Sequence, residues 1–509
     1  MSQAASKSAR HHASHKDTFD QIVLMLVLAF TFRVFAVEAF VIPTGSMAPT
    51  LMGAHARFTC DNCGYHYDVN YSGVSDRSGD INIPRRADGM NYAVNCPNCG
   101  FEQSTPVPNI YYGDRILVLK YAALFESPKR WDVVVFKSPD RPKEYHYSQA
   151  YIKRLIGLPG EQIMILDGDI YAATKPNATD RDWTVQQKPD VVQNALWRVI
   201  NDIDFAPADG QVPWKPQGDA WRYSRDSSGA RSLLFSNIND AQAVSFDPGV
   251  GADRKPLADF LAYDQHGPQR SLQPVGDLKL SLYYTRNAGD GPLELNLSKD
   301  RDLFTAVIEP SKVSLYRARI DAPKKKLLMA TAPYFFASQP ARLDFVNVDY
   351  RVRLLVDGKQ VLTTTAPQYH PDVAAIRARE QQPLLSQVSI TAAKQVCSLA
   401  HVSLWRDSYY TQSAADGRPI DRGGPDKPVT LGSTEYFCLG DNSPLSGDGR
   451  FWTAPVSLPA EGIQAQAGVV PERFMLGKAL MVYWPAGYRP LSSGVPDLIP
   501  NMGEMRFIH

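Results

Sequence analysis

The chain has 509 residues, of which 44% are hydrophobic and 21% are charged. It is too long for one ordinary core and too apolar to be disordered, so we expect two or three domains. The 54 basic residues almost balance the 53 acidic ones, and a net charge of +1 argues against nucleic acid as a partner. A mean hydropathy of −0.28 excludes a polytopic membrane protein but is compatible with one anchor.

The N-terminal region predicts a single membrane anchor. Residues 1–17 form a basic leader, and 18–37 are 20 mostly apolar residues with Asp20 and Arg33 near the two ends. At about 1.5 Å per residue, such a helix spans the ~30 Å of hydrocarbon in a bilayer. The basic leader would stay in the cytoplasm, which leaves the rest of the chain outside. A cleaved signal peptide and a buried amphipathic helix are the alternatives, but no small-x-small cleavage site appears before Glu38.

The rest of the chain has the pattern of strands joined by turns. Three β-rich runs predict an antiparallel sheet, at 113–120, 131–137 and 152–158. A second β-patterned tract covers about 176–428, with runs at 278–282, 312–316, 343–348 and 351–356. The last run ends at Asp357-Gly358, a type I′ hairpin signal. We expect this tract to form a β-sandwich, of which a jelly roll is one variant.

Ser46 is the first candidate for chemistry. It lies in the segment 42–51, Ile-Pro-Thr-Gly-Ser-Met-Ala-Pro-Thr-Leu, where a glycine frees the backbone beside the hydroxyl and prolines stiffen both flanks. This arrangement suits a nucleophile, although a Gly-Ser pair is more often only a turn.

Lys153 is the candidate base for such a nucleophile, because none of the ten histidines stands at a recognisable spacing. It lies in the apolar run 151–160, where burial would favour the neutral amine and lower its pKa from the usual ~10.4. A neutral amine can act as a general base. The alternative is an edge lysine whose amine reaches solvent.

Four segments, in order along the chain, resemble the boxes of the bacterial type I signal peptidases, also called leader peptidases. They are 42–51, Gly-Asp-Arg-Ile-Leu-Val at 113–118, Tyr-Ile-Lys-Arg-Leu-Ile-Gly-Leu-Pro-Gly-Glu at 151–161, and Gly-Asp-Asn-Ser-Pro-Leu-Ser-Gly-Asp-Gly-Arg-Phe-Trp at 440–452. The resemblance covers less than half of the chain. It implies a catalytic domain built on an antiparallel β-sheet and a Ser/Lys dyad.

The resemblance also implies roles for individual residues. Ser46 matches the nucleophile and Lys153 the general base. Thr44 matches a hydroxyl residue that, with the Ser46 N–H, stabilises the oxyanion, and Ser446 matches the residue that orients the lysine amine. The supporting positions are Asp448, Arg450, Gly440, Asp441 and Asn442. The substrate groove, which admits small side chains in an Ala-x-Ala pattern, is matched by Ile42, Met47, Leu51, Tyr151 and Ile152. One departure is Ser443-Pro-Leu445, where many members have Arg-Asp-Asn.

Four cysteines predict a zinc ribbon between the first two boxes. Cys60 and Cys63 form one C-x-x-C pair, Cys96 and Cys99 form another 32 residues later, and each pair is followed by glycine. This spacing presents four thiolates to Zn²⁺, and four protein ligands leave no open position for catalysis. Two disulfides, or a redox pair, are the alternatives. The other two cysteines, Cys397 and Cys438, are expected to be small core residues.

The large insertion has a weaker resemblance of its own. The run 342–358 resembles the core hairpin of concanavalin-like or laminin-G-like sandwiches. A sugar or peptidoglycan ligand is one interpretation, and an inert spacer or docking module is the other.

The predicted organisation has seven parts. They are a leader (1–17), an anchor (18–37), three catalytic parts (38–57, 104–175 and 429–509), a zinc-ribbon-like insertion (58–103) and a β-sandwich-like insertion (176–428).

The resemblance implies a membrane-anchored serine endopeptidase, a hydrolase, that removes signal peptides from exported preproteins at the outer face of the bacterial cytoplasmic membrane. Catalysis would need no cofactor, and the lipid bilayer and the export machinery would be further partners. The alternative function is a membrane-tethered binding protein that uses the β insertion and keeps a remnant peptidase fold.

Overall fold

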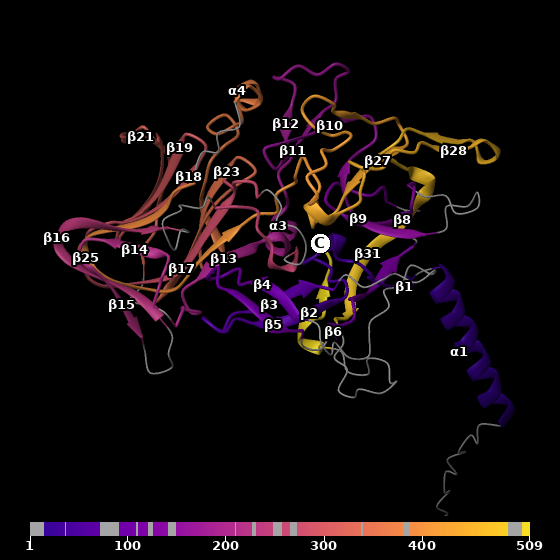
Figure 1. Cartoon of the computed structure of the whole chain (residues 1–509), viewed down its shortest axis with the longest axis horizontal. Helices are drawn as coiled ribbons and strands as arrows, with labels where there is room; N and C mark the ends of the chain where they lie inside the picture. Colours follow the sequence, from indigo (N-terminus) through magenta and orange to yellow (C-terminus); the bar gives the residue numbers. More distant parts are fainter. Residues whose placement is uncertain are drawn as a thin grey trace, which may run out of the picture.

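The computed structural model describes residues 15–35, 37–71, 91–107, 110–120, 126–140, 149–208, 210–225, 231–247, 257–264, 272–336, 339–379, 386–486 and 501–509. The chain is mainly β, as predicted, and its sheets form two lobes with the C-terminus near their junction (Figure 1). The α-helices of this part are α1 (His15–Phe35), α3 (Asp190–Leu196) and α4 (Val373–Ala378). The short 3-10 helices are η1 (Gly45–Met47), η2 (Ala262–Asp264), η3 (Ser443–Leu445), η4 (Pro459–Glu461), η5 (Glu472–Phe474) and η6 (Met502–Glu504).

The N-terminal helix α1 extends away from the sheets (Figure 1). Within the described ranges, no helix combines the length and the apolar character needed to cross a membrane. The anchor predicted at 18–37 stays a prediction without support from this finding, and residues 1–14 of the predicted leader lie outside the described residues.

An eight-stranded antiparallel sheet forms the framework of the smaller lobe. Its strands run in the order β1 (Val37–Val41), β7 (Arg115–Leu119), β31 (Met475–Trp484), β8 (Val133–Lys137), β9 (Ala150–Gly157), β27 (Glu435–Leu439) and β30 (Val470–Pro471), with β32 (Arg506–Phe507) paired to β31. The runs predicted as strands at 113–120, 131–137 and 152–158 are β7, β8 and β9, so this prediction is confirmed.

Strand β8 shows why these residues form a central strand. Val133 and Val135 join one hydrophobic cluster, while Val134 and Phe136 join another on the opposite face. Because side chains alternate along a strand, a continuous apolar run is buried on both faces of the sheet. Smaller sheets extend this lobe: β12 (Thr184–Val185), β11 (Asp169–Ala173), β10 (Gln162–Leu166) and β26 (Val429–Thr430) in one, and β28 (Val456–Leu458) with β29 (Ile463–Ala465) in another.

The region of the paired cysteines consists of short hairpins between the two lobes. Its strands are β2 (His55–Thr59), β3 (His66–Asn70) and β6 (Ile110–Tyr111) in one sheet, and β4 (Asn91–Asn95) with β5 (Glu102–Pro106) in another. Their small core contains Cys60 and Cys96, together with Ala262 from the large insertion.

The large insertion forms the other lobe around a core of its own. Its strands are β13 (Arg198–Asp202), β14 (Trp214–Gln217), β15 (Trp221–Arg225), β16 (Arg231–Phe246), β17 (Leu278–Gly289), β18 (Leu293–Lys299), β19 (Asp302–Ile308), β20 (Lys312–Arg319), β21 (Ala322–Pro333), β22 (Ala341–Val348), β23 (Arg351–Val356), β24 (Lys359–Thr363) and β25 (Val388–Arg406). All thirteen belong to one connected sheet, whereas we expected two packed sheets. The long strands β16 and β25 contain register shifts and curve visibly, which lets one sheet enclose a core (Figure 1).

The hairpin predicted at Asp357-Gly358 is confirmed. Both residues have positive φ, 49° and 76°, and the flanking Val356 and Lys359 pair directly across β23 and β24. A two-residue loop of this kind needs φ > 0 at both central positions, which Asp and Gly tolerate.

Candidate active site

The Ser46 side chain projects from a tightly held loop between β1 and β2, which we call the nucleophile loop (residues 42–53). A Cβ at Gly53 would lie 2.4 Å from the Thr44 carbonyl carbon, and one at Gly113 would lie 1.8 Å from the Ile42 oxygen. Only glycine permits such close backbone approach. The two glycines therefore let the loop fold back on itself and against the start of β7.

Lys153 and Ser46 come together across 107 residues of sequence. Lys153 Nζ donates a hydrogen bond to Ser46 Oγ at 2.8 Å and a second one to the Ile152 carbonyl at 3.0 Å. Lys153 lies in β9 and is 5% exposed, whereas Ser46 in η1 is half-buried. The hydroxyl can therefore meet a ligand while the amine stays out of water.

The burial of Lys153 changes its acidity. Loss of solvent lowers the pKa of the amine to about 8, because charging a buried amine is costly, and nearby Asp448 partly opposes this shift. A lysine with this pKa is substantially neutral at mildly alkaline pH. It can then accept a proton, as a general base requires.

The loop after β27 packs beneath the dyad. Asp448 and Arg450 have fully buried side chains and form a salt bridge at 2.7 Å, and Asp448 also accepts a hydrogen bond from the Gly440 N–H at 3.0 Å. A Cβ at Gly440 would lie 2.4 Å from the Ser46 carbonyl oxygen. This turn therefore lies directly against the backbone of Ser46.

The Ser446 hydroxyl is buried in the same loop, but the predicted hydrogen bond to Lys153 is not present. Ser446 Oγ has no hydrogen-bond partner among the described residues. The Lys153 amine bonds to Ser46 and to the Ile152 carbonyl. Thr44 is exposed next to Ser46, and its side chain makes no capping hydrogen bond to η1.

Asp441 has a partner that the sequence did not reveal. Its carboxylate forms a two-point salt bridge with Arg154, at 2.7 Å to both Nε and Nη2, and both side chains are fully buried. Arg154 also donates to the Trp131 and His509 carbonyls. An arginine beside the lysine in an apolar strand was the available signal, since such a residue needs a buried acid.

Asn442 contacts the nucleophile loop twice. Its backbone N–H donates to the Ser46 carbonyl at 3.1 Å, and its side-chain Nδ2 donates to the Gly45 carbonyl at 3.1 Å. The same Nδ2 lies 2.8 Å from Asp264 Oδ1, in the large insertion. The insertion therefore reaches the active-site loop, which the sequence did not predict.

The departure at Ser443-Pro-Leu445 has its own set of contacts. Arg450 donates to Ser443 Oγ at 2.6 Å and to the Ser443 carbonyl at 2.7 Å, and it also reaches the Thr411 carbonyl at 2.8 Å. A short serine therefore replaces the longer polar residues found in many members, and it uses the buried arginine as its partner.

The predicted substrate-groove residues lie in two environments. Ile42, Met47 and Leu51 are at most 2% exposed and belong to one hydrophobic cluster under the eight-stranded sheet. Apolar side chains on this short loop pack into the core, and their contact with a substrate stays a prediction. Tyr151 and Ile152 of β9 are half-buried beside the dyad, and these two still present surface.

The four paired cysteines come together as predicted. All four Sγ atoms lie within 4.8 Å of one another, and the Cys60–Cys99 and Cys63–Cys96 sulfur atoms are 3.6 Å apart. A tetrahedral Zn²⁺ with bonds of ~2.3 Å would separate its sulfur ligands by ~3.8 Å, whereas a disulfide needs ~2.05 Å. The donor set therefore fits zinc. Cys397 and Cys438 are buried core residues, as predicted.

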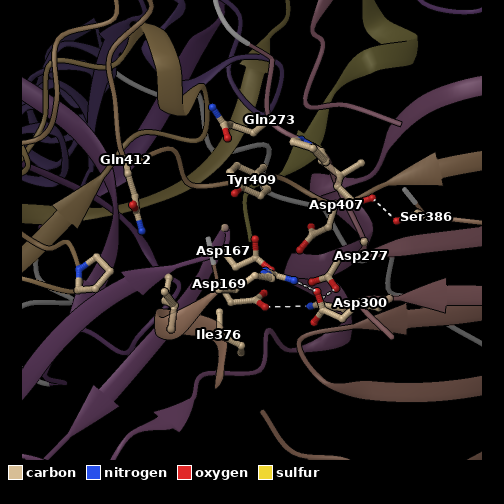
Figure 2. A pocket seen from close by; sticks show the side chains of 18 of the residues that line it. Asp167, Asp169, Gln273, Asp277, Asp300, Ile376, Ser386, Asp407, Tyr409 and Gln412 are labelled. Atoms are coloured by element: carbon tan, nitrogen blue, oxygen red, sulfur yellow. Dashed lines mark hydrogen bonds and ion pairs between the residues drawn. The ribbon is translucent and has the colours of Figure 1, made fainter. Parts of the chain in front are cut away.

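A separate pocket lies where the β10–β11 hairpin meets the large insertion, with a volume of about 690 Å³. Figure 2 shows carboxylates of Asp167, Asp169, Asp277 and Asp300 gathered at one side of it. Lys299 bridges two of these carboxylates, at 2.9 Å to Asp169 and 2.5 Å to Asp277. Arg379 pairs with the other two. These ion pairs connect the hairpin to the insertion.

Comparison with protein families identifies one match over part of the chain. Residues 96–214 match the family described as "Signal peptidase, peptidase S26". This range contains Lys153 but neither Ser46 nor the segment 440–452. Because it is less than half of the chain, it does not by itself assign the whole protein.

Curated relatives agree with this match. The chain is 28% identical over 149 residues to signal peptidase I of Rickettsia bellii (strain OSU 85-389), covering 29% of this chain and 36% of that protein. It is 33% identical over 72 residues to probable signal peptidase I-2 of Synechocystis sp., covering 14% and 33%. The alignments thus span less than half the length of these relatives. Together the matches support a hydrolase of the signal peptidase I type.

Some solved structures match part of the chain with low scores. A carbohydrate binding module from Bacillus subtilis matches with a TM-score of 0.24 and 9% identity, covering 38% of this chain and 95% of that chain. Sheep galectin-11 matches with a TM-score of 0.18 and 12% identity, covering 27% and 98%. Scores this low carry no argument, so the concanavalin-like or laminin-G-like sandwich stays a prediction.

Proposed function

We propose that this protein is a type I signal peptidase, a serine endopeptidase that removes signal peptides from exported preproteins with a Ser46/Lys153 dyad. The observation that carries the proposal is the 2.8 Å hydrogen bond between Lys153 Nζ and Ser46 Oγ. A buried lysine with a pKa of about 8 beside a half-buried serine has the geometry and the acidity of a base and its nucleophile.

The dyad works through one proton. The neutral Lys153 amine takes the proton of the Ser46 hydroxyl while Oγ attacks the scissile carbonyl carbon. The resulting ammonium then gives this proton to the leaving amine of the mature protein, which leaves an ester on Ser46. A water molecule, activated by the same amine, hydrolyses the ester and releases the signal peptide.

The negative charge that develops on the scissile carbonyl oxygen has to be stabilised by hydrogen-bond donors. In this proposal the Ser46 N–H and the exposed Thr44 hydroxyl supply them. Donors fixed in place before the reaction stabilise the tetrahedral intermediate without reorganisation, and loss of one donor typically costs about 100- to 1000-fold in rate.

Specificity for Ala-x-Ala sites belongs to the proposal as well. An extended substrate can lie along an exposed strand edge, where main-chain hydrogen bonds give affinity and shallow pockets reject bulky side chains. The half-buried Tyr151 and Ile152 are the predicted groove residues that could contact such a substrate. The location at the outer face of the cytoplasmic membrane, and contacts with the bilayer and the export machinery, stay predictions.

The alternative function, a binding protein with a remnant peptidase fold, has less support. A remnant site has no reason to keep a nucleophile and a buried amine in hydrogen-bond contact, because holding a lysine out of water costs free energy. The assembled pair of Ser46 and Lys153 therefore favours the enzyme.

The test is cleavage of a purified preprotein with an Ala-x-Ala site. We expect Ser46→Ala and Lys153→Ala each to abolish cleavage, and the double variant to be no worse than either single one, because the two residues act as a unit. Lys153→Arg should fail too, since a guanidinium does not lose its proton.

Two control substitutions show whether a loss of cleavage comes from the dyad or from nonspecific damage to the fold. Ser457→Ala on β28 and Lys326→Ala on β21 change the same residue types far along the chain from the dyad, and both should cleave at the rate of the unchanged protein. Independent, multiplying losses from Ser46→Ala and Lys153→Ala would argue against a dyad.

We also propose that the four paired cysteines bind one Zn²⁺ for structural reasons. Each pair forms a turn in which the following glycine, at φ +74° for Gly64 and +72° for Gly100, donates its N–H to the first cysteine's carbonyl. When bound, the ion would be held by Cys60, Cys63, Cys96 and Cys99 and would stabilise this small region. A fully protein-coordinated zinc has no position open to substrate.

A further inference from the structure

We propose that η2, a turn of the large insertion, positions the nucleophile loop, with Asp264 acting on the Ser46 backbone through Asn442. The proposal rests on the proposed peptidase function and makes the insertion part of the catalytic machinery. Three observations support it: the contact of Tyr263 with Gly45, the hydrogen bond of Asp264 with Asn442, and the contacts that hold η2 in place.

Tyr263 packs directly on the residue before the nucleophile. A Cβ at Gly45 would lie only 2.2 Å from Tyr263 Cε1, so the aromatic ring rests on the backbone of the loop. Tyr263 is 2% exposed, and its ring also lies near His55, which begins β2. The ring therefore fills the space on one side of Gly45.

Asp264 fixes the orientation of a single amide group. Asn442 Nδ2 donates to both Asp264 Oδ1, at 2.8 Å, and the Gly45 carbonyl, at 3.1 Å. Both partners are acceptors, so Asp264 holds the NH₂ group toward Gly45 and opposes a flip of the amide. Asn442 is 1% exposed, so an exchange of these bonds for water is costly.

The Gly45 carbonyl matters because of its place in the peptide group. The carbonyl of Gly45 and the N–H of Ser46 belong to the same planar peptide, and they point in opposite directions. A hydrogen bond that fixes the carbonyl therefore also fixes the N–H. That N–H is the proposed oxyanion donor, and its direction decides whether it stabilises the intermediate.

The turn η2 is itself firmly held by the insertion. Arg406, at the end of β25 and 4% exposed, donates to the backbone carbonyls of Asp259 and Phe260 at 3.0 and 2.8 Å. Ala262 is part of the hydrophobic core around the paired cysteines. A rigid support of this kind is what a positioning residue requires.

The central test replaces Asp264. We expect Asp264→Ala to lower kcat for preprotein cleavage about 10- to 100-fold, while KM changes by less than about threefold, because the loss affects the transition state. Asp264→Asn keeps an acceptor oxygen for Asn442 Nδ2 and should recover kcat to within about threefold of the unchanged protein. Because a smaller folded fraction also lowers the apparent kcat at constant KM, each rate is divided by the concentration of folded protein. A loss of kcat that remains after this correction and is rescued by asparagine supports positioning.

The matched control is Asp302→Ala. Asp302 is also a buried aspartate of the insertion, where it pairs with Arg317 at 2.8 Å. Among the described residues, no side-chain hydrogen bond or ion pair joins it to the nucleophile loop. We expect its kcat to stay within about threefold of the unchanged protein. An equal loss in Asp302→Ala and Asp264→Ala would overturn the proposal, because any damage to the insertion would then suffice.

Hydrogen exchange separates this proposal from the proposed function. We expect amides of residues 42–53 to exchange faster in Asp264→Ala than in the unchanged protein, with no such change in Asp302→Ala. If the unchanged protein does not cleave preproteins, the proposed function fails, and this comparison alone decides the positioning. Unchanged exchange in Asp264→Ala would overturn the positioning role.

A second variant pair tests the tyrosine contact. Gly45→Ala alone drives a methyl group into Tyr263 and should impair cleavage. Adding Tyr263→Ala makes room for this methyl group, so the double variant should be less impaired than the product of the two single effects predicts. Strictly multiplying effects would overturn the contact.

Discussion

In the proposed mechanism, Lys153 can act as a base only in the part of the pH range where its amine is neutral. Burial lowers the pKa of this amine to about 8 from an ordinary value near 10.4. The folded protein therefore loses this proton at a lower pH than a free lysine does. The charged form, present at lower pH, cannot accept the serine proton.

The rate of preprotein cleavage should consequently rise as pH increases through about 8 and level off above it. The measurement is kcat/KM as a function of pH, which reports the pKa of the free enzyme. A rate that still climbs at pH ~10.4 would show that the lysine is not desolvated. A rate that falls between pH 7 and 9 would show that the ammonium form is the active one.

We expect the ion pair of Arg154 and Asp441, beside the dyad, to stabilise the folded protein. Both side chains are fully buried and paired at 2.7 Å, so removal of the arginine leaves an uncompensated buried carboxylate. We expect Arg154→Ala to lower the free energy of unfolding by about 3–5 kcal/mol. Chemical denaturation followed by fluorescence measures this loss.

The control for Arg154→Ala is Lys326→Ala, which breaks the ion pair of Lys326 with Glu294. The side chains of both partners are about a third exposed. Such a pair contributes less than about 1 kcal/mol. Similar losses in the two variants would contradict the idea that burial makes the Arg154–Asp441 pair important.

At the scale of elements, the paired cysteines predict a metal-dependent region. We expect the purified chain to contain one Zn²⁺, and Cys96→Ala to lose it together with a large part of the thermal stability, since metal binding supplies folding free energy to a region with a small core. Elemental analysis and a thermal melt test this.

Cys397→Ala is the matched control, because Cys397 is a buried cysteine outside the cluster and should leave the zinc content unchanged. Absence of zinc together with two disulfides would contradict the prediction. A chelated protein that stays folded but is wholly inactive, and recovers at once with zinc, would contradict the structural role.

Elements with a strong local signal could be predicted from the sequence. The apolar runs of β7, β8 and β9 and the Asp357-Gly358 turn depend on neighbouring residues alone, so their pattern indicates their structure. Each C-x-x-C pair is a local signal of the same kind, and the four cysteines do come together. The burial of Met47 and Leu51 could not be predicted in this way, because it depends on what the rest of the chain packs against them.

At the scale of the whole molecule, the contact between the insertion and the candidate active site could not be predicted from the sequence. Asp264 contacts Asn442, and Thr411 contacts Arg450, across long stretches of the chain. Asn442 and Arg450 lie in a recognisable segment, but no motif surrounds Asp264 or Thr411. Long-range pairing of this kind is decided by tertiary packing. By contrast, the Ser46–Lys153 pair could be predicted because two recognisable segments carry it.

The central claim, that Ser46 cleaves signal peptides with Lys153 as its base, is tested most directly by the N-terminus of the product. A purified preprotein with one Ala-x-Ala site is incubated with the unchanged protein and with Ser46→Ala, and the mature product is sequenced from its N-terminus. We predict that the unchanged protein yields a product that begins directly after the second alanine, and that Ser46→Ala yields none. Comparable turnover by Ser46→Ala, or a product that begins elsewhere, would contradict the account.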